Sequence, residues 1–180
     1  MPEKLGFITP TLLKVLYVFH EDPMRELYER EVVRKAGISK GSANSILRRL
    51  AETGILKRKK AGRMVFYRFN DKSPVARQLK ILFNVYSLQK LVDQIKSHCK
   101  RIMLFGSCTE GLDVSESDVD LFILTREKKE VMEKVSAYQK NLDRKLSPII
   151  VDANGFTRLK REDRPLYERI LKGIMLWESE

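Results

Sequence analysis

The chain has 180 residues, of which 43% are hydrophobic, with only 9 Gly and 6 Pro. This composition excludes a disordered or collagen-like chain and leaves room for one large or two small globular domains. The longest apolar run, Val15–Phe19, spans five residues, far short of a membrane helix, and residues 1–10 lack the apolar core of a signal peptide. Two cysteines cannot build a disulfide framework, so we expect a cytoplasmic protein without membrane contact.

Charge is distributed unevenly along the chain. The formal net charge of +11 comes from 35 basic and 24 acidic residues. Residues 1–98 contain 20 basic and 9 acidic side chains, whereas residues 99–180 contain 15 of each, so the first half carries the whole excess. This asymmetry favours an N-terminal half that binds a polyanion. Nucleic acid fits better than an anionic membrane, because no basic helix there has Trp or Phe on an apolar face.

Residues 9–52 predict three helices. The first begins at Thr9 or Thr11, a short second helix covers residues 31–36, and Ser39 can cap the third. One side of the third helix is an apolar stripe facing a core: Ala43, Ile46, Leu47 and Leu50. Its opposite side carries small and polar residues: Gly41, Asn44, Ser45 and Arg48, flanked by Ser42 and Arg49. Such a face can enter a major groove, where Arg and Asn make bidentate contacts to base edges.

A basic hairpin is predicted after Gly54, which is placed to end the third helix. Its strands cover residues 55–60 and 64–69 around a glycine-containing turn. Basic side chains near the turn could lie along a phosphate backbone: Lys57, Arg58, Lys59, Lys60 and Arg63.

The stretch EVVRKAGISKGSANSILRRLAETGILKRKKAGRMVFYRFN resembles the winged helix-turn-helix of prokaryotic transcriptional regulators. The resemblance spans roughly residues 8–72 and implies a winged helix-turn-helix domain over residues 1–72 that binds double-stranded DNA. A winged helix that contacts only protein is the alternative.

A long connecting helix is predicted over residues 73–98. Ser73 can cap it, Pro74 suits its first turn, and no helix breaker follows until about His98. Two apolar lines run along it: Leu79, Leu82, Phe83 and Tyr86, then Leu88, Leu91, Val92 and Ile95. Two explanations stay open. The helix could join two copies into a homodimer, or it could pack against the chain's own C-terminal half.

The C-terminal half contains the candidate catalytic residues. A buried strand over residues 101–105 ends in Gly106 and Ser107, and Asp118 and Asp120 precede an apolar run over residues 121–124. Two aspartates separated by one residue of a strand project to the same face, where they can hold Mg²⁺ or Mn²⁺. A Gly-Ser pair lets the backbone approach a phosphate closely. Together they supply two requirements of phosphoryl-type transfer: a metal that neutralises charge and a triphosphate held in place.

The segment LFGSCTEGLDVSESDVDLFIL resembles the signature of the DNA polymerase beta-like nucleotidyltransferase superfamily, in its minimal nucleotidyltransferase form. The resemblance implies an α+β chain whose residues 99–180 form a small mixed-sheet nucleotidyltransferase domain. It implies that Gly106 and Ser107 bind the phosphates of a nucleoside triphosphate, with ATP expected, and that Asp118 and Asp120 are the catalytic metal ligands. The implied activity is transfer of a nucleoside monophosphate to an acceptor hydroxyl. One role in the family is an antitoxin that modifies a partner protein.

The sequence departs from the family pattern at the third carboxylate. Members often place it on the next strand, predicted here over residues 146–151, where Ser147 occupies the expected position. Asp152 has the opposite parity on that strand, Pro148 favours an edge strand or a bulge, and Glu116 could substitute. The departure supports an alternative function: a winged-helix transcriptional regulator with a degenerate, nucleotide-sensing or inactive transferase domain.

Overall fold

The computed structural model describes residues 9–179. Residues 1–8, where we expect no signal peptide, lie outside the described residues. The chain is α+β, with two separate sheets, and divides into two compact units, Met1–Lys80 and Ile81–Glu180. Within residues 9–179, no helix has both the length and the apolar character needed to cross a membrane.

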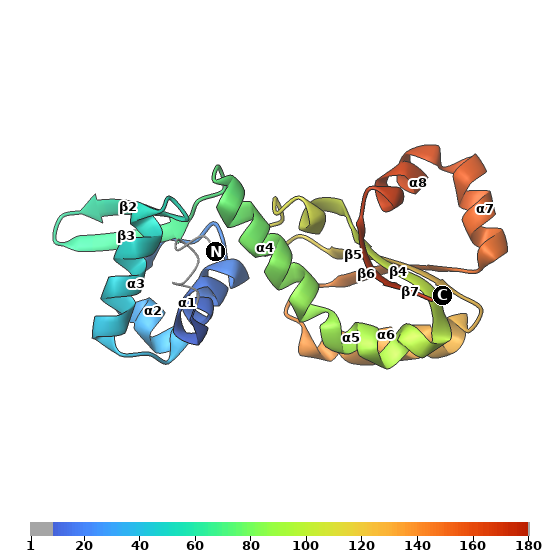
Figure 1. The fold of residues 1–180 in the computed structure, drawn as a ribbon, viewed down its shortest axis with the longest axis horizontal. Coiled ribbons are helices and arrows are strands. Elements are labelled where there is room, and N and C mark those ends of the chain that lie inside the picture. The colour runs from blue at the N-terminus through green and yellow to red at the C-terminus, as the bar shows by residue number, and fades with distance from the viewer. Residues whose placement is uncertain (1–8, 180) are drawn as a thin grey trace, which may run out of the picture. The chain divides into compact units, whose positions relative to one another are not determined.

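The first unit combines three helices with a three-stranded antiparallel sheet (Figure 1). Its elements are α1 (Pro10–Glu21), β1 (Leu27–Tyr28), α2 (Glu29–Ala36), α3 (Lys40–Glu52), β2 (Leu56–Ala61) and β3 (Met64–Phe69). The sheet order is β1-β3-β2, and the predicted hairpin is confirmed, with Ala61 paired to Met64 across its turn. The sequence analysis missed β1, which is only two residues long.

Local signals in the sequence account for the ends of these helices. The hydroxyl of Thr9 accepts a hydrogen bond from Leu12 N, and that of Ser39 accepts one from Ser42 N, so both predicted caps are present. Gly54 follows α3 with a φ of +73°. Most of the predicted stripe of α3 is fully buried: Ala43, Leu47 and Leu50. The opposite face of α3 is exposed, as predicted.

The predicted helix over residues 73–98 is broken at Leu88. Helix α4 (Pro74–Ser87) is followed by α5 (Gln89–Ile95) and a short 3-10 helix, η2 (Lys96–His98). The Ser87 hydroxyl donates to the Asn84 carbonyl, a contact that bends helices, and the Ser87 carbonyl accepts from the Tyr138 hydroxyl. The break directs the second apolar line into the core of the second unit, where its members are buried: Leu88, Leu91, Val92 and Ile95.

This burial favours the second explanation of the apolar lines for residues 88–95, namely packing within the chain's own C-terminal half. On α4, by contrast, Leu82 and Tyr86 are exposed.

The second unit is a four-stranded mixed sheet of order β6-β5-β4-β7. Its further elements are β4 (Cys99–Phe105), η3 (Gly106–Thr109), β5 (Val119–Thr125), α6 (Lys128–Tyr138), η4 (Gln139–Asn141), β6 (Leu146–Val151), α7 (Ala153–Glu162), α8 (Arg164–Leu171) and β7 (Ile174–Glu178). Strand β5 pairs antiparallel with β4 and parallel with β6, and β4 pairs antiparallel with β7. The mixed sheet expected for this half is therefore confirmed.

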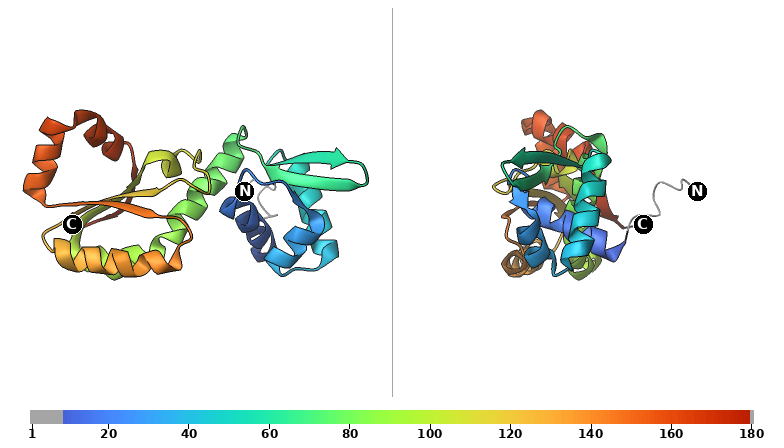
Figure 2. Two further views of the ribbon diagram at one scale, coloured as in Figure 1. Left: turned by 180° about the vertical axis from the view of Figure 1, so that it is seen from behind. Right: turned by 90° about the vertical axis from the view of Figure 1, so that its left-hand side faces the viewer.

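Helices cover both faces of this sheet (Figures 1 and 2). Helices α5 and α6 pack on one face over a core that includes Leu104, Leu121 and Ile123. Helices α7 and α8 pack on the other, where a smaller core contains Phe105 and Phe122. Since side chains alternate along a strand, Asp120 belongs to the face of Phe122, near the end of β4 that carries Gly106.

Candidate active site

The Gly-Ser pair lies at the end of β4, in the first turn of η3. Gly106 has a φ of +74°, a region that favours glycine. A Cβ built at this position would overlap the Oδ2 atom of Asp120. The carboxylate of Asp120 therefore lies directly against the backbone of Gly106. The two halves of the predicted motif, ten residues or more apart in sequence, meet here.

Asp118 and Asp120 lie at the beginning of β5, with Asp118 just before the strand and Asp120 paired with Phe105 of β4. Their side chains are 39% and 27% exposed. Both carboxylates are thus partly open to solvent, at the beginning of a strand that is otherwise mostly buried.

Two cations that the sequence analysis missed contact these aspartates. Lys145 Nζ lies 3.2 Å from Asp118 Oδ2, and Arg169 Nη2 lies 3.9 Å from Asp120 Oδ2. Lys145 precedes Ser147 by two residues, so strand parity could have indicated it. Arg169 lies on α8, and no local pattern points from that helix to β5.

The electrostatics distinguish the two carboxylates. Burial is the main cause of a raised pKa of Asp120. The Arg169 guanidinium opposes that rise, and the charge of Asp118 adds to it. A cation beside Asp120 therefore stabilises the ionised form of this carboxylate.

The residues present suit a hard divalent cation. They offer carboxylate oxygens on one short segment, and burial, with a smaller contribution from the charge of Asp118, raises the pKa of Asp120, so a cation beside this carboxylate would favour its ionised form. The compensating side chains Lys145 and Arg169 are 74% and 61% exposed, so they can move away when another cation binds. Asp118 and Asp120 would hold such an ion.

A third carboxylate is missing from the position expected for it. Ser147 lies beside Asp120 in the parallel register of β5 and β6. Strand β6 is at the sheet edge, as Pro148 predicted, and its register has no bulge. Asp152 caps α7, accepting from Gly155 N at 2.7 Å, and pairs with Lys128 at 2.7 Å. Glu116 is exposed in the loop before Asp118.

The predicted nucleic-acid-binding residues divide into two groups. Asn44, Arg48, Arg58 and Arg63 line one groove of about 1060 Å³ between α3 and the β2–β3 hairpin. The same groove contains Arg30 and Lys40, and Asn44 donates to Glu29 at 2.6 Å. The other predicted residues do not line it: Ser42, Ser45, Arg49, Lys57, Lys59 and Lys60. Within this second group, Lys57 pairs with Asp71, and Lys59 lies 3.2 Å from Glu26.

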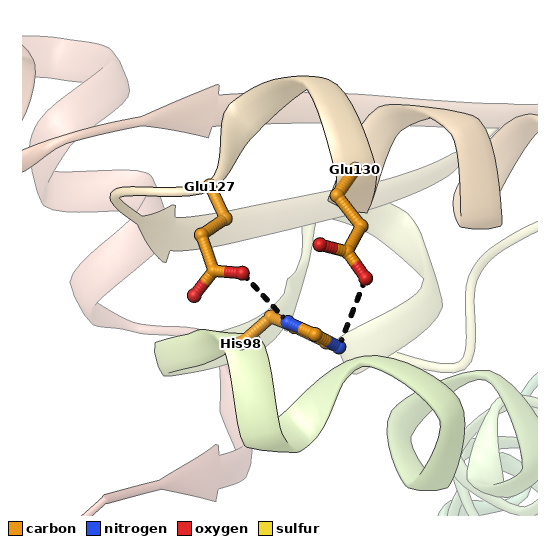
Figure 3. Close-up of side chains that lie close together, drawn as sticks. All are labelled: His98, Glu127 and Glu130. Carbon is orange, nitrogen blue, oxygen red and sulfur yellow. Dashed lines mark hydrogen bonds and ion pairs between the residues drawn. The ribbon is translucent and has the colours of Figure 1, made fainter.

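A second polar cluster joins η2 to the start of α6 (Figure 3). His98 Nδ1 lies 2.8 Å from Glu127, and its Nε2 lies 3.2 Å from Glu130. Within the described residues, His98, Glu127 and Glu130 have ligand atoms that lie within 4.8 Å of one another, close enough to surround a metal ion. Lys134 Nζ already lies 2.9 Å from Nε2 and 3.2 Å from Glu130, so the chain itself supplies a cation to this cluster.

Comparison with known proteins identifies the class of the second unit. Residues 88–180, more than half of the chain, match the family model described as polymerase beta, nucleotidyltransferase. The chain therefore belongs to the polymerase beta nucleotidyltransferase family, and the match includes α5. The family generally uses a divalent metal and a nucleoside triphosphate.

A solved structure is also similar. It is the crystal structure of a proposed nucleotidyltransferase from Sulfolobus solfataricus, with 16% identity and a TM-score of 0.40, covering 60% of this chain and 92% of that chain. Comparison with curated proteins gives no match.

Proposed function

We propose that the second unit transfers a nucleoside monophosphate from a metal-bound nucleoside triphosphate, with ATP expected, to an acceptor hydroxyl. The acceptor oxygen forms a bond to the α-phosphorus, the bond between that phosphorus and the bridging oxygen breaks, and diphosphate leaves. The proton of the acceptor hydroxyl passes to solvent water, and the electron pair of the broken bond stays with the diphosphate. The observation that carries this proposal is the contact of the Gly106 backbone with the Asp120 carboxylate, since the turn proposed to bind phosphate then lies against a carboxylate proposed to bind the metal.

Each group of the site has a role in this reaction. The backbone and hydroxyl of Gly106 and Ser107 would bind the triphosphate, and Asp118 and Asp120 would hold Mg²⁺ or Mn²⁺. When bound, the ion neutralises phosphate charge and polarises the α-phosphate. Lys145 and Arg169 are close enough to exchange their carboxylate partners for phosphate oxygens.

Thermal unfolding with Mg²⁺ and each nucleoside triphosphate tests this proposal without knowledge of the acceptor. A ligand at a hundred times its dissociation constant stabilises a protein by about 2.7 kcal/mol, enough to move the melting of a small domain by several degrees. We expect a metal-dependent shift for the wild type that Asp118→Asn, Asp120→Asn loses. Asp143→Asn, at an exposed aspartate, is the matched control and should keep the shift.

If no nucleotide shifts the melting, or if the double variant responds as the wild type does, these aspartates do not hold a metal-bound nucleotide. The protein is then better explained as the regulator with a degenerate transferase domain.

We also propose that residues 1–72 are a winged helix-turn-helix domain that binds double-stranded DNA. The order of helices and strands in the first unit supports this, with the exposed polar face of α3 next to the β2–β3 hairpin. The basic groove between them supports it further, because five of its lining residues are Arg or Lys: Arg30, Lys40, Arg48, Arg58 and Arg63. DNA binding would locate or regulate the transferase activity.

The acceptor and the assembly are finer parts of this proposal. The family resemblance supports a protein acceptor and an antitoxin role in the cytoplasm. A homodimer would need a surface other than the buried residues of α5, and the exposed Leu82 and Tyr86 of α4 are apolar residues available for one.

A further inference from the structure

One guanidinium contacts both ends of the loop that joins the two halves of the proposed site. Arg144 Nη2 donates to Cys108 Sγ at 3.1 Å, and its Nε donates to the Ser117 carbonyl at 3.0 Å. Cys108 directly follows Ser107, and Ser117 directly precedes Asp118. The phosphate-binding end and the metal-binding end of this loop therefore share one side chain as a contact.

The orientation of Arg144 is fixed by buried partners. Its Nη1 lies 2.8 Å from Asp113 Oδ2, and the side chains are 17% and 2% exposed. Asn84 of α4 donates to Asp113 Oδ1 at 3.1 Å and to the Cys108 carbonyl at 3.0 Å, and its Oδ1 accepts from Arg144. A planar guanidinium with partners on all three nitrogens has one available position.

The loop itself has few other anchors. Glu110 N and Leu112 N donate to the Ser107 carbonyl, and Ser117 exchanges hydrogen bonds with Val114. These contacts stay within the loop. One further contact joins its two ends directly, because the Cys108 thiol donates to the Asp118 carbonyl at 3.7 Å. A thiol is a weak donor, so the charged hydrogen bonds of Arg144 are the stronger link between the ends.

We propose that Arg144 is a positioning residue that sets the spacing between Ser107 and Asp118. This rests on the proposed nucleotidyl transfer function and deepens it. Arg144 acts through Cys108 and Ser117 and touches no substrate. Its role matters because a displacement of about 1 Å between groups that share a substrate can cost about a hundredfold in rate. Lysine cannot replace it, because an ammonium is a point charge without the fork that reaches both ends.

The test compares Arg144→Lys with Arg101→Lys. Arg101 pairs with Glu178 between β4 and β7, away from the loop, so its variant also loses a paired guanidinium in the same unit. Two quantities are measured well below the melting temperature: the affinity for Mn²⁺ with ATP, and the exchange rates of the Leu112 and Ser117 amides without ligand. For Arg144→Lys we expect an affinity lower by about tenfold or more and faster exchange at both amides. Arg101→Lys should change neither.

The outcomes separate this proposal from the function on which it rests. A lower melting temperature in Arg144→Lys with unchanged affinity and exchange would mean that Arg144 only stabilises the fold, and would overturn the proposal. If the wild type does not bind Mn²⁺ with ATP, the proposed function falls and the role of Arg144 falls with it. If Arg144→Lys does not fold, Asn84→Ala is the milder test of the same arrangement, because it removes the Asn84 oxygen that helps to orient Arg144 and leaves the ion pair between Arg144 and Asp113. The same drop in affinity and the same faster exchange are expected, to a smaller extent, and no change in either would overturn the proposal.

Discussion

The carboxylate of Asp120 occupies the space that a side chain at Gly106 would need. A Cβ at position 106 would overlap Asp120 Oδ2, and the φ of +74° independently favours glycine. The requirement for glycine therefore has two separable causes, one steric and one conformational.

Gly106→Ala is expected to destabilise the second unit by about 1–3 kcal/mol, measured by urea unfolding, and to abolish stabilisation by Mg²⁺ and nucleotide. The same substitution in an Asp120→Ala background should cost less, because only the backbone strain remains. Equal costs in the two backgrounds would show that the contact with Asp120 contributes nothing.

Asp120→Asn is expected to make the metal-free protein more stable at pH 7. Burial raises the pKa of Asp120 in the folded protein above the ordinary value of 3.8, so ionisation of this group opposes folding. That penalty is fully present at neutral pH, shrinks as the pH falls through the raised pKa, and is absent below the ordinary value.

Melting temperatures of both proteins between pH 3 and pH 7 check this, with an expected gain on the order of 1–4 °C at the neutral end. The gain should vanish at the acidic end. A loss of stability at pH 7 would contradict the stated direction. Asp143→Asn serves as the control for removal of an exposed negative charge.

Ser147→Asp is expected to strengthen binding of Mn²⁺. Position 147 lies beside Asp120 in the parallel register, so a carboxylate there would join the same face as the two aspartates. Without the ion, repulsion should lower the melting temperature, so the variant should show the larger metal-induced rise. Ser147→Asn has nearly the same shape without the charge and should behave as the wild type. Equal Mn²⁺ affinities for the Asp and Asn variants would argue against a place for a third ligand at this position.

Arg58→Ala is expected to weaken binding of duplex DNA more than Lys59→Ala does. Arg58 lines the basic groove, whereas Lys59 lies 3.2 Å from Glu26 and is already partly neutralised. Titrations at several salt concentrations should show a slope of log K against log salt that is smaller by about 0.9 for Arg58→Ala. Lys14→Ala, at an exposed position of α1, is the control. Affinities that do not depend on salt would refute a phosphate contact by the hairpin.

The parts of the fold that follow from local pattern could be predicted from the sequence. The caps at Thr9 and Ser39, the buried stripe of α3 and the hairpin each depend on neighbouring residues, and they are present. The break at Leu88 could not be predicted in this way. The Ser87 carbonyl at the break accepts a hydrogen bond from Tyr138, which lies about fifty residues away in the sequence.

The same distinction holds for the candidate site. Gly106, Ser107, Asp118 and Asp120 lie within one short segment, and their motif indicates that they meet. Arg169 lies on α8 and Arg144 in the connection before β6, and packing of the whole unit decides where both segments lie, so no spacing rule connects them with the aspartates. The roles of all these residues stay predictions.

Strand β7 has a consequence for how this protein is made. It covers one side of β4, and Arg101 of β4 is paired with Glu178, 77 residues further along the chain. During synthesis, β4 therefore has an open edge until β7 leaves the ribosome, although the Gly-Ser turn and both aspartates have emerged long before. Open strand edges can pair with other chains. Nascent chains on one messenger would accordingly be exposed to pairing through β4 until β7 docks on this edge.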